Sequence, residues 1–259
     1  MQIVFIGAGR LATNLAPALQ RVGHSILQVY SRTMDAAKML ADRVGAIAIT
    51  DLQKVSTEAD VYVFSVTDTA LPQLILQMPP VSKNSVFLHT AGSVPMKVFE
   101  GRGGHYGVFY PMQTFSKGCD VDFKTIPVFI EGNDSRSQQV VKELAISVSE
   151  NVRELSSEGR RHLHLAAVFA CNFANHCYEL SAEILAKYGV PFEVMLPLVD
   201  ETAAKVHKMS PRDAQTGPAV RCDEKVLEAQ KGLLTDNPLH AQIYDLMSRS
   251  ISQSSLIDK

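Results

Sequence analysis

The chain has 259 residues, 46% of them hydrophobic, and it carries a formal net charge of −2 at pH 7. This length and apolar content suit one large domain or two modest ones with a packed core. The near-neutral charge argues against nucleic acid or an anionic membrane surface as a partner, and no apolar run is long enough to span a bilayer.

The N-terminal residues predict a buried strand that is followed directly by a glycine-containing turn and a helix. The strand covers Ile3–Gly7 and the helix covers Arg10–Val22, with the sequence GAGRLA at the turn. Pro17 lies inside this helix, where it removes a backbone hydrogen bond, and we expect a local kink there. Because the N-terminus lacks the charged leader of a secretory signal and the cysteines form no CxxC pair, we expect a cytoplasmic location.

The small residues of this turn point to a particular ligand. Gly7 permits a tight turn, Gly9 lets a phosphate approach the backbone, and Ala12 lets the helix lie close to the strand. The free amides and the positive dipole end of such a helix bind a pyrophosphate. We therefore predict dinucleotide binding, and the alternative is a tight strand–helix turn in some other α/β protein.

The end of the second predicted strand, Ser25–Tyr30, distinguishes between two coenzymes. NAD-binding proteins usually place an acid there to hold the ribose hydroxyls, whereas this chain has Ser31 and Arg32. A cation at the start of the next predicted helix, Met34–Val44, is unfavourable unless an anion joins it. A ribose 2′-phosphate is such an anion, and a guanidinium binds it with two hydrogen bonds. We predict NADP, and the alternative is a solvated arginine beside a serine cap.

Strand and helix patterns continue to alternate, with short turns, to about residue 155. This alternation predicts an α/β fold with a doubly wound, mostly parallel sheet that helices cover on both faces. The further strands are predicted at Ala46–Ile49, Val61–Val66, Ser85–Leu88, His105–Phe109, Pro127–Ile130 and Val152–Leu155, and the further helices at Leu71–Met78 and from the Asn133-Asp134 cap to about Ser149.

Several polar residues follow the predicted strands, at the edge of the sheet where ligands of such folds bind. They are Thr67, Asp68, His89, Thr90 and Ser93. Each has a structural alternative. Asp68 is suited to cap a helix, Thr90 and Ser93 to satisfy turn amides, and His89 to be buried and bonded to the backbone.

Only helical patterns follow from about residue 157. We therefore predict a dinucleotide-binding domain over residues 1–155 and an all-α domain over residues 156–259, with the boundary near Leu155. The first helix of the second domain, His162–Lys187, contains neither glycine nor proline and would be about 40 Å long if unbroken. Further helices are predicted at Phe192–Met209, Asp223–Leu233 and Pro238–Ile251.

Polar residues interrupt the apolar positions of this long helix, among them His164, Asn172 and His176. Such groups are costly unless bonded, so they mark either a network between helices or the wall of a site. Cys171, His176 and Cys177 fit no common zinc spacing, and we interpret them as buried residues of a helix rather than metal ligands. We expect all four cysteines to be reduced thiols.

Five motifs together resemble one known family. GAGRLA, the serine–arginine turn, HTAGS, YPMQTF and TGPAVRCD occur in the order found in a bacterial family of Rossmann-like proteins of unknown function. This family is related to deazaflavin-dependent NADP oxidoreductases, pyrroline-5-carboxylate reductases and β-hydroxyacid dehydrogenases. The resemblance covers nearly the whole chain. It implies an NADP-binding Rossmann domain followed by a helical domain like the C-terminal part of 6-phosphogluconate dehydrogenase, which commonly forms a homodimer.

The resemblance also implies roles for individual residues near the coenzyme. The turn would hold the pyrophosphate, the serine–arginine pair would hold the 2′-phosphate, and two residues after the fourth strand would lie along the nicotinamide. These implied coenzyme-binding residues are Gly7, Gly9, Arg10, Leu11, Ser31, Arg32, Val66 and Thr67.

The chain departs from the related dehydrogenases at the catalytic position. They use a lysine on the interdomain helix, whereas the only lysine on this helix is Lys187, near its far end. Tyr110 also stands where many relatives have histidine. His164 is the nearest replacement for the lysine, because histidine donates or accepts a proton near neutral pH.

We therefore hypothesise an NADP-dependent oxidoreductase that transfers a hydride to or from a small carbonyl or imine substrate in the interdomain cleft. His164 would donate the proton and Asn172 would orient the substrate, while His89, Ser93 and Gln113 would shape the pocket. The alternative is a protein that senses NADP(H) without turnover, which would need no catalytic acid.

Overall fold

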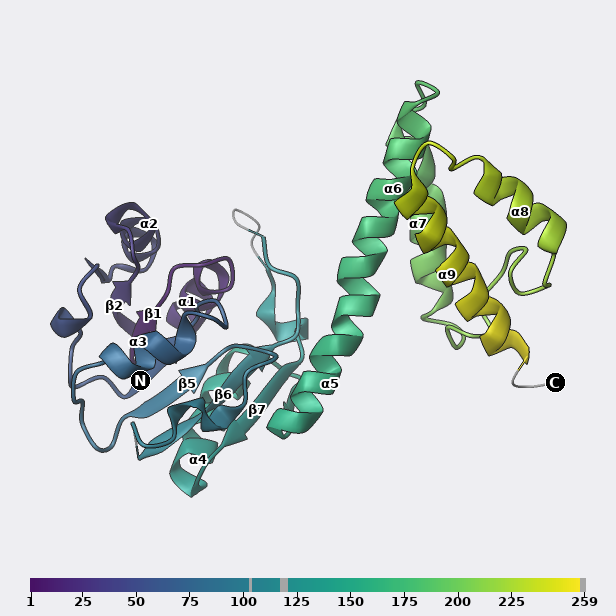
Figure 1. The fold of residues 1–259 in the computed structure, drawn as a ribbon. Helices are drawn as coiled ribbons and strands as arrows, with labels where there is room; N and C mark the ends of the chain where they lie inside the picture. The colour runs from purple at the N-terminus through teal and green to yellow at the C-terminus, as the bar shows by residue number, and fades with distance from the viewer. Residues whose placement is uncertain (103, 117–120, 257–259) are drawn as a thin grey trace. The chain divides into compact units, whose positions relative to one another are not determined.

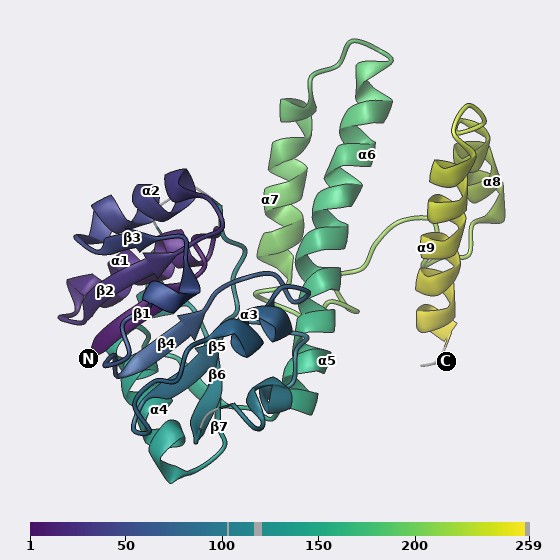
Figure 2. The ribbon, with the colours of Figure 1, turned by 60° about the vertical axis from the view of Figure 1, so that its left-hand side comes forward.

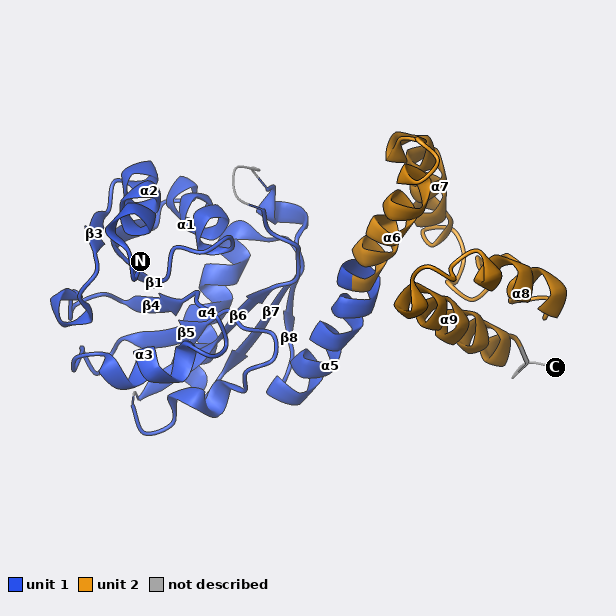
Figure 3. Ribbon diagram, turned by 45° about the horizontal axis from the view of Figure 1, so that its top comes forward, with its two compact units in different colours: residues 1–172 blue, residues 173–259 orange. Residues whose placement is uncertain are grey.

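The computed structural model describes residues 1–102, 104–116 and 121–256, and the chain divides into two compact units (Figure 1). Unit 1 covers Met1–Asn172 and unit 2 covers Phe173–Lys259 (Figure 3). The division lies within the long helical segment, whereas the sequence predicted a boundary near Leu155. The first turns of this segment group with unit 1 because their side chains bond to the sheet, as the site geometry below shows.

Unit 1 contains a single sheet, which has eight strands within the described residues, in the order β3-β2-β1-β4-β5-β6-β7-β8. Neighbouring strands are parallel except β6 and β7, which are antiparallel. The prediction of a doubly wound, mostly parallel sheet is confirmed. The strands are β1 (Gln2–Ile6), β2 (Ser25–Tyr30), β3 (Ile47–Ile49), β4 (Val61–Phe64), β5 (Val86–His89), β6 (His105–Pro111), β7 (Val128–Gly132) and β8 (Val152–Glu154).

Helices cover both faces of this sheet, which explains why the central strands are mostly apolar on both faces. In β1, Ile3 and Phe5 pack toward α1, α2 and α4, whereas Val4 and Ile6 pack toward α3 and Phe99. Figure 2 shows α3 and α4 on opposite sides of the sheet. The helices of unit 1 are α1 (Ala12–Arg21), α2 (Met34–Val44), α3 (Leu71–Gln77), α4 (Ser135–Val148) and α5 (Ser157–Ala167), and its 3₁₀ turns are Leu52–Lys54, Met96–Phe99 and Phe123–Thr125.

Helix α1 contains Pro17 at its centre. Proline has no backbone N–H, so the carbonyl of Thr13, four residues earlier, loses its partner within the helix. Arg43 of α2 replaces that partner, because its Nη1 donates a hydrogen bond to the Thr13 oxygen at 3.0 Å. The neighbouring helix thus satisfies the group that Pro17 leaves free, while the predicted kink at this residue stays a prediction.

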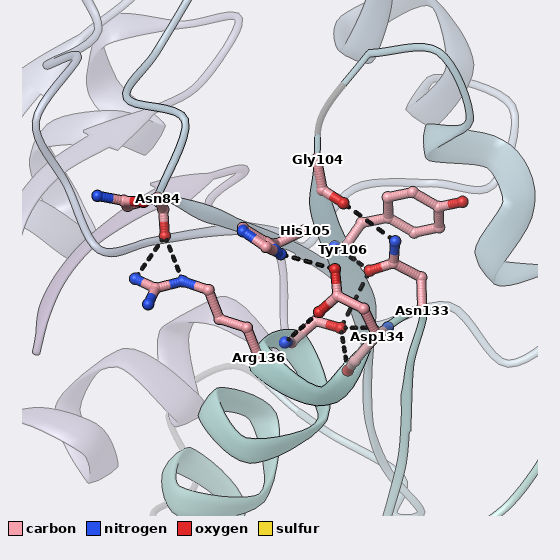
Figure 4. A network of polar contacts seen from close by, with 8 residues as sticks. Asn84, Gly104, His105, Tyr106, Asn133, Asp134 and Arg136 are labelled. Atoms are coloured by element: carbon pink, nitrogen blue, oxygen red, sulfur yellow. Dashed lines mark hydrogen bonds and ion pairs between the residues drawn. The ribbon is translucent and has the colours of Figure 1, made fainter.

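Helix α4 begins at a polar network that ties it to the start of β6 (Figure 4). The Asp134 carboxylate accepts a hydrogen bond from the Ser137 amide at 2.8 Å, and the Ser137 hydroxyl completes a capping box at 3.1 Å from the Asp134 amide. The second Asp134 oxygen accepts from His105 Nδ1 at 2.6 Å. Asn133 and Arg136 extend the network to neighbouring backbone carbonyls. The predicted Asn133-Asp134 cap is confirmed, with Asp134 as the N-cap.

Replacing Asp134 with alanine is expected to lower the free energy of unfolding by about 1 kcal/mol, the usual cost of a lost N-cap. Burial raises the pKa of this carboxyl, but hydrogen bonds from Ser137 and His105 outweigh burial and leave the pKa below its usual value. A lowered folded pKa stabilises the protein above the unfolded pKa, and this stabilisation is lost as pH falls through the folded pKa.

Urea denaturation across acidic pH checks this prediction. The difference in the free energy of unfolding between the wild-type protein and Asp134→Ala should become smaller as the pH falls. Glu143→Ala, on the exposed side of the same helix, is the control and should change stability by less than about 0.5 kcal/mol. If this difference in the free energy of unfolding stayed constant into strong acid, the ionised Asp134 carboxylate would not be the source of the stabilisation.

The long helical segment contains an irregular turn. Residues Val168–Phe173 form a π-helix between α5 and α6 (Ala174–Ala186), whereas the sequence predicted a regular helix over His162–Lys187. Apolar periodicity does not reveal a π-bulge, because the side chains before and after it keep a helical pattern.

The described residues of unit 2 form helices and turns and no strand. Its helices are α6, α7 (Leu196–Lys205), α8 (Glu224–Gly232) and α9 (Pro238–Leu256), with a 3₁₀ turn at Phe192–Met195 before α7. Asp223 caps α8 by accepting a hydrogen bond from the Val226 amide at 3.4 Å. Only Ala219 and Leu234 are buried hydrophobic residues among those described in this unit. Unit 2 by itself therefore has almost no core.

The predicted thiols can be compared with the structure at three positions. Cys171, Cys177 and Cys222 are free cysteines. Cys177 and His176 are exposed and Cys171 is only half-buried, contrary to the expectation that these three residues are buried. Cys119 lies outside the described residues. Within the described ranges no group of three or more His, Cys, Asp and Glu side chains is placed to hold a metal ion.

No helix formed by the described residues is sufficiently long and apolar to cross a bilayer.

Candidate functional site

The turn after β1 has a geometry that only glycine adopts without strain. Gly7 has a φ of +116°, and its amide donates to the Tyr30 carbonyl at 2.8 Å. A Cβ at this position would lie 2.2 Å from the Ser65 carbonyl oxygen of the neighbouring chain segment. At Gly9 the nearest atom to such a Cβ is 3.8 Å away, so the fold has room for a methyl group there. Gly7 is therefore required by the fold, while an absent side chain at Gly9 leaves the backbone open to a ligand.

The N-terminus of α1 follows this turn and leaves several amides without an intrahelical partner. The first backbone hydrogen bond of the helix runs from the Thr13 amide to the Gly9 carbonyl at 3.0 Å. The amides before Thr13 are therefore available to an anion, and the helix dipole favours negative charge there. Ala12 is fully buried, in agreement with its predicted role in close helix–strand packing.

A cavity of about 580 Å³ opens at the carboxyl ends of the central strands. Every residue predicted to bind the coenzyme lines it, together with Gln113 from the predicted pocket and His164 from the predicted catalytic pair. The coenzyme-binding residues that line it are Gly7, Gly9, Arg10, Leu11, Ser31, Arg32, Val66 and Thr67.

Charged side chains lie at different parts of the cavity lining. Arg10 follows β1 and Arg32 follows β2, and both are exposed. Asp68, the residue directly after Thr67, follows β4 and also lines the cavity. The two guanidinium groups thus lie beside the turn predicted to hold phosphates, where cations complement the helix amides.

A tyrosine and a histidine from distant parts of the chain meet at this cavity. Tyr110 at the end of β6 and His164 on α5 both line it, and the Tyr110 hydroxyl lies 3.0 Å from His164 Nδ1. The two rings meet edge to face, with their centroids 6.1 Å apart. Burial raises the pKa of Tyr110; the positive charge of Arg160 opposes this shift and the Asp68 carboxylate adds to it. The phenol therefore stays protonated at neutral pH.

Arg160, one helical turn before His164, attaches α5 to the sheet. Its side chain is only 1% exposed. Its Nη1 donates to the Glu131 carboxylate on β7 at 2.7 Å, and its Nη2 donates to the Val94 carbonyl at 2.7 Å. Ser157 joins the group by donating to the same Glu131 oxygen at 2.7 Å. Because residues four apart share a helix face, these bonds also place His164 against the sheet edge.

Three predicted site residues lie elsewhere. His89 is fully buried and does not line the cavity; its ring packs against Phe99, and its Nδ1 accepts from the Ala91 amide at 3.1 Å. Burial, assisted by the charge of Arg160, lowers the pKa of His89 to about 3, so the ring is neutral. His89 is therefore the buried histidine bonded to the backbone that the sequence offered as the alternative to a ligand contact. Ser93 is exposed and outside the cavity lining, and Asn172 is exposed within the π-helical turn.

The residues that hold the site together were not predicted from the sequence. Arg160, Ser157 and Glu131 carry no motif, although an arginine four residues before a histidine on an apolar stripe is a usable signal of a shared buried face. The sequence marked Tyr110 only as a residue that replaces the histidine of many relatives, and it did not predict the contact with His164. The structure explains why a glycine occupies position 92 of the HTAGS motif. A Cβ at Gly92 would lie 2.6 Å from His164 Nδ1.

Comparison with known proteins agrees with this geometry. Residues 2–91 match the family described as NADP oxidoreductase, coenzyme F420-dependent, and residues 126–251 match a domain of unknown function, DUF2520. None of the curated proteins matches the chain. A solved protein from Thermotoga maritima is 24% identical, with a TM-score of 0.73, 99% of this chain and 99% of that chain being covered.

Two enzymes share the fold at lower identity. A reductive aminase from Aspergillus terreus, solved with NADPH and ethyl-5-oxohexanoate, is 15% identical with a TM-score of 0.74 and coverage of 98% of this chain and 93% of that one. An imine reductase from Myxococcus stipitatus, solved with NADP⁺, is 16% identical with a TM-score of 0.71 and coverage of 98% and 94%.

A solved protein from Bacteroides fragilis is much more similar. It is provisionally assigned as an NADP oxidoreductase and is 51% identical, with a TM-score of 0.93 and coverage of 97% of this chain and 98% of that chain. Identity at this level over nearly the whole of both chains means that this protein belongs to the same family, that of the Rossmann-like NADP oxidoreductases.

Proposed function

We propose that this protein is an NADP-dependent oxidoreductase that transfers a hydride to or from a small carbonyl or imine substrate, with His164 as the proton donor. One observation carries the proposal. The glycine turn suited to a pyrophosphate and the Tyr110–His164 pair suited to proton transfer line the same cavity. The coenzyme supplies the hydride when bound, and the chain's own residues bind, orient and protonate.

NADP is the coenzyme that the residues of the cavity fit. The amides before Thr13 and the side chain of Arg10 belong to the turn at the start of α1. This turn is where a pyrophosphate would bind. Ser31 and Arg32 stand where NAD-binding proteins carry an acid, and their hydroxyl and guanidinium suit a ribose 2′-phosphate. Two structures of the same fold reported above, at 15% and 16% identity, were solved with NADPH and NADP⁺.

Replacing Arg32 with alanine is expected to weaken NADPH binding about tenfold and to leave NADH binding unchanged, because NADH has no 2′-phosphate. A hydrogen bond to a charged group contributes about 1.5–3 kcal/mol, which corresponds to a tenfold or larger change. Nicotinamide fluorescence titration gives both dissociation constants. Arg10→Ala is the matched control, since loss of a pyrophosphate contact should weaken both coenzymes alike. Equal affinities of the wild-type protein for NADPH and NADH would contradict the choice of coenzyme.

The substrate class rests on the chemistry of the cavity wall. His164 can donate a proton to the oxygen or nitrogen of a reduced carbonyl or imine, and Gln113 offers an amide that can orient a polar substrate. One protein of the same fold is named a reductive aminase and another an imine reductase. The orienting role of Asn172 stays a prediction.

A substrate screen tests the activity. Small ketones and aldehydes, each with and without a primary amine, are incubated with the protein and NADPH, and loss of nicotinamide absorbance is followed. Oxidation that needs the amine identifies an imine reductase, and oxidation without it identifies a carbonyl reductase.

A second function has one observation in its favour. The only lysine on the long helical segment is Lys187, which follows α6 and pairs with Asp236 in unit 2. The catalytic lysine of related dehydrogenases is therefore missing from α5, which suits a protein that binds NADP(H) as a sensor. Tight NADPH binding without oxidation of NADPH by any compound of the screen would favour this function over the reductase.

We propose further that the protein forms a homodimer through unit 2. Large apolar side chains of this unit are exposed, among them Tyr188 at 79%, Leu233 at 76% and Leu198 at 63%, while its own core is minimal. Monomeric proteins rarely leave so much apolar surface in water, and a second copy of the same unit would cover it.

Sedimentation velocity is expected to give the mass of two 28.4 kDa chains. Leu198→Asp should shift the protein toward monomer, since a charge in an apolar interface is costly. Leu76→Asp is the matched control, because Leu76 is also 63% exposed but lies on α3 of unit 1. A wild-type monomer at all concentrations would contradict the proposed dimer.

We also propose a cytoplasmic location for the reaction. The free thiols of Cys171, Cys177 and Cys222 suit a reducing compartment, where cysteines remain unpaired.

A further inference from the structure

The Tyr110 side chain makes a contact that nothing in the dehydrogenase resemblance assigns. Its hydroxyl lies 3.0 Å from His164 Nδ1, within hydrogen-bond distance. A hydroxyl can donate or accept, and a neutral imidazole has one donor and one acceptor nitrogen. Tyr110 is 8% exposed, and burial keeps its phenol protonated by raising its pKa. In the favoured arrangement the phenol therefore donates, and Nδ1 is the acceptor.

The Nδ1 side of the imidazole is closely packed. Gly92 lies against the imidazole so closely that a Cβ would stand 2.6 Å from Nδ1 and 2.7 Å from Cγ. Tyr110 and Gly92 both line the cavity with His164; Tyr110 lies at the end of β6 and Gly92 follows β5. The Arg160 anchor, one turn earlier on α5, holds the histidine in this position through Glu131 and the Val94 carbonyl.

The other ring nitrogen, Nε2, is available. Among residues 1–102, 104–116 and 121–256 it has no protein hydrogen-bond partner. It is also not buried. A neutral imidazole that accepts at Nδ1 carries its hydrogen on Nε2. The accessible nitrogen is thus the one that can donate.

We propose that Tyr110 is the positioning residue of the site: it holds His164 in the tautomer with hydrogen on Nε2 and replaces the proton that His164 gives to the substrate. This inference rests on the proposed oxidoreductase function.

The proton steps balance with one proton from solvent in each cycle. As the substrate gains a hydride from the coenzyme, the Nε2–H bond breaks and an O–H or N–H bond forms on the substrate. The Tyr110 O–H bond breaks and an Nδ1–H bond forms, so the imidazole remains neutral throughout. The positive charge of Arg160 favours the phenolate left on Tyr110. The site resets when the Nδ1 proton returns to this phenolate and a proton from solvent binds Nε2. The relay therefore avoids an anionic imidazolate.

A spectroscopic experiment tests the tautomer without any substrate. Long-range proton–nitrogen correlation NMR of isotope-labelled histidine side chains distinguishes a protonated ring nitrogen from a bare one, and His164→Gln identifies the signals of this residue. In the wild-type protein with the imidazole neutral, we expect hydrogen on Nε2 and a hydrogen-bonded, unprotonated Nδ1. In Tyr110→Phe the Nδ1 shift should move to that of an unbonded nitrogen. Hydrogen on Nδ1 in the wild-type protein would overturn the proposal.

Kinetics test the consequence. With a substrate from the screen, Tyr110→Phe is expected to lower kcat about tenfold, the cost of one hydrogen bond in the transition state, with KM and NADPH affinity nearly unchanged. Tyr106→Phe, on the same strand but outside the cavity lining, is the matched control and should leave every constant unchanged. Wild-type kcat in Tyr110→Phe would overturn the relay.

The two proposals can fail separately. A protein that does not bind NADPH disproves the proposed function, whereas the NMR result depends only on the geometry of Tyr110 and His164. Retained NADPH binding and turnover in Tyr110→Phe would disprove the relay alone.

Discussion

The His164→Ala variant is expected to turn over its substrate at least about 100-fold more slowly than the wild-type protein. A positioned general acid contributes roughly 10²–10⁴-fold to a reaction rate, and no other imidazole lines the described cavity. NADPH binding should change little, because the glycine turn and Arg32 are unaltered. Stopped-flow or steady-state loss of nicotinamide absorbance measures kcat, and fluorescence titration measures the coenzyme affinity.

A neighbouring histidine is the matched control for this variant. His162 lies on the same helix and is exposed, and its ring bonds only to the Glu158 carbonyl, at 2.9 Å, among the described residues. His162→Ala should keep wild-type kcat, so a loss confined to His164→Ala reflects the site rather than the helix. Unchanged turnover in His164→Ala would show that this residue is not the proton donor.

The Gly7→Ala variant is expected to lose about 100-fold in NADPH affinity and on the order of 3 kcal/mol in stability. A residue other than glycine is strained at a φ of +116°, and its Cβ would overlap the Ser65 carbonyl oxygen at 2.2 Å. The turn must therefore move, and the amides at the start of α1 move with it. Coenzyme fluorescence titration and urea denaturation measure the two losses.

Two further glycines separate the causes of these losses. Gly45 also has a positive φ, +61°, but a Cβ there meets no atom within 4 Å, so Gly45→Ala should cost about 1 kcal/mol and leave coenzyme binding intact. Gly9→Ala should fold normally, because its Cβ would be 3.8 Å from the nearest atom. It should bind NADPH more weakly, because its methyl group would stand where we propose that the diphosphate binds. Normal NADPH binding by Gly7→Ala would contradict the placement of the coenzyme at this turn.

Much of the fold was predictable because it depends on short stretches of sequence. The strand Ser25–Tyr30 and the helix Met34–Val44 have the bounds that their apolar spacing and the closing Gly45 predicted. The coenzyme half of the site was equally accessible, since Ser31 and Arg32 directly follow a buried strand. The carboxyl ends of parallel strands lie at one edge of a sheet, and this fact alone brings these residues to the turn after β1.

The sequence by itself thus determined the order of strands and helices, the glycine turn and the chemistry suited to NADP, because each follows from local periodicity, backbone freedom or charge. Only the tertiary structure decided which polar groups meet. Tyr110 and His164 are 54 positions apart, Arg160 reaches Glu131 from another element, and His89 is enclosed rather than facing the ligand. No local pattern encodes such pairings, because they depend on which strand lies beside which and on how α5 is anchored to the sheet.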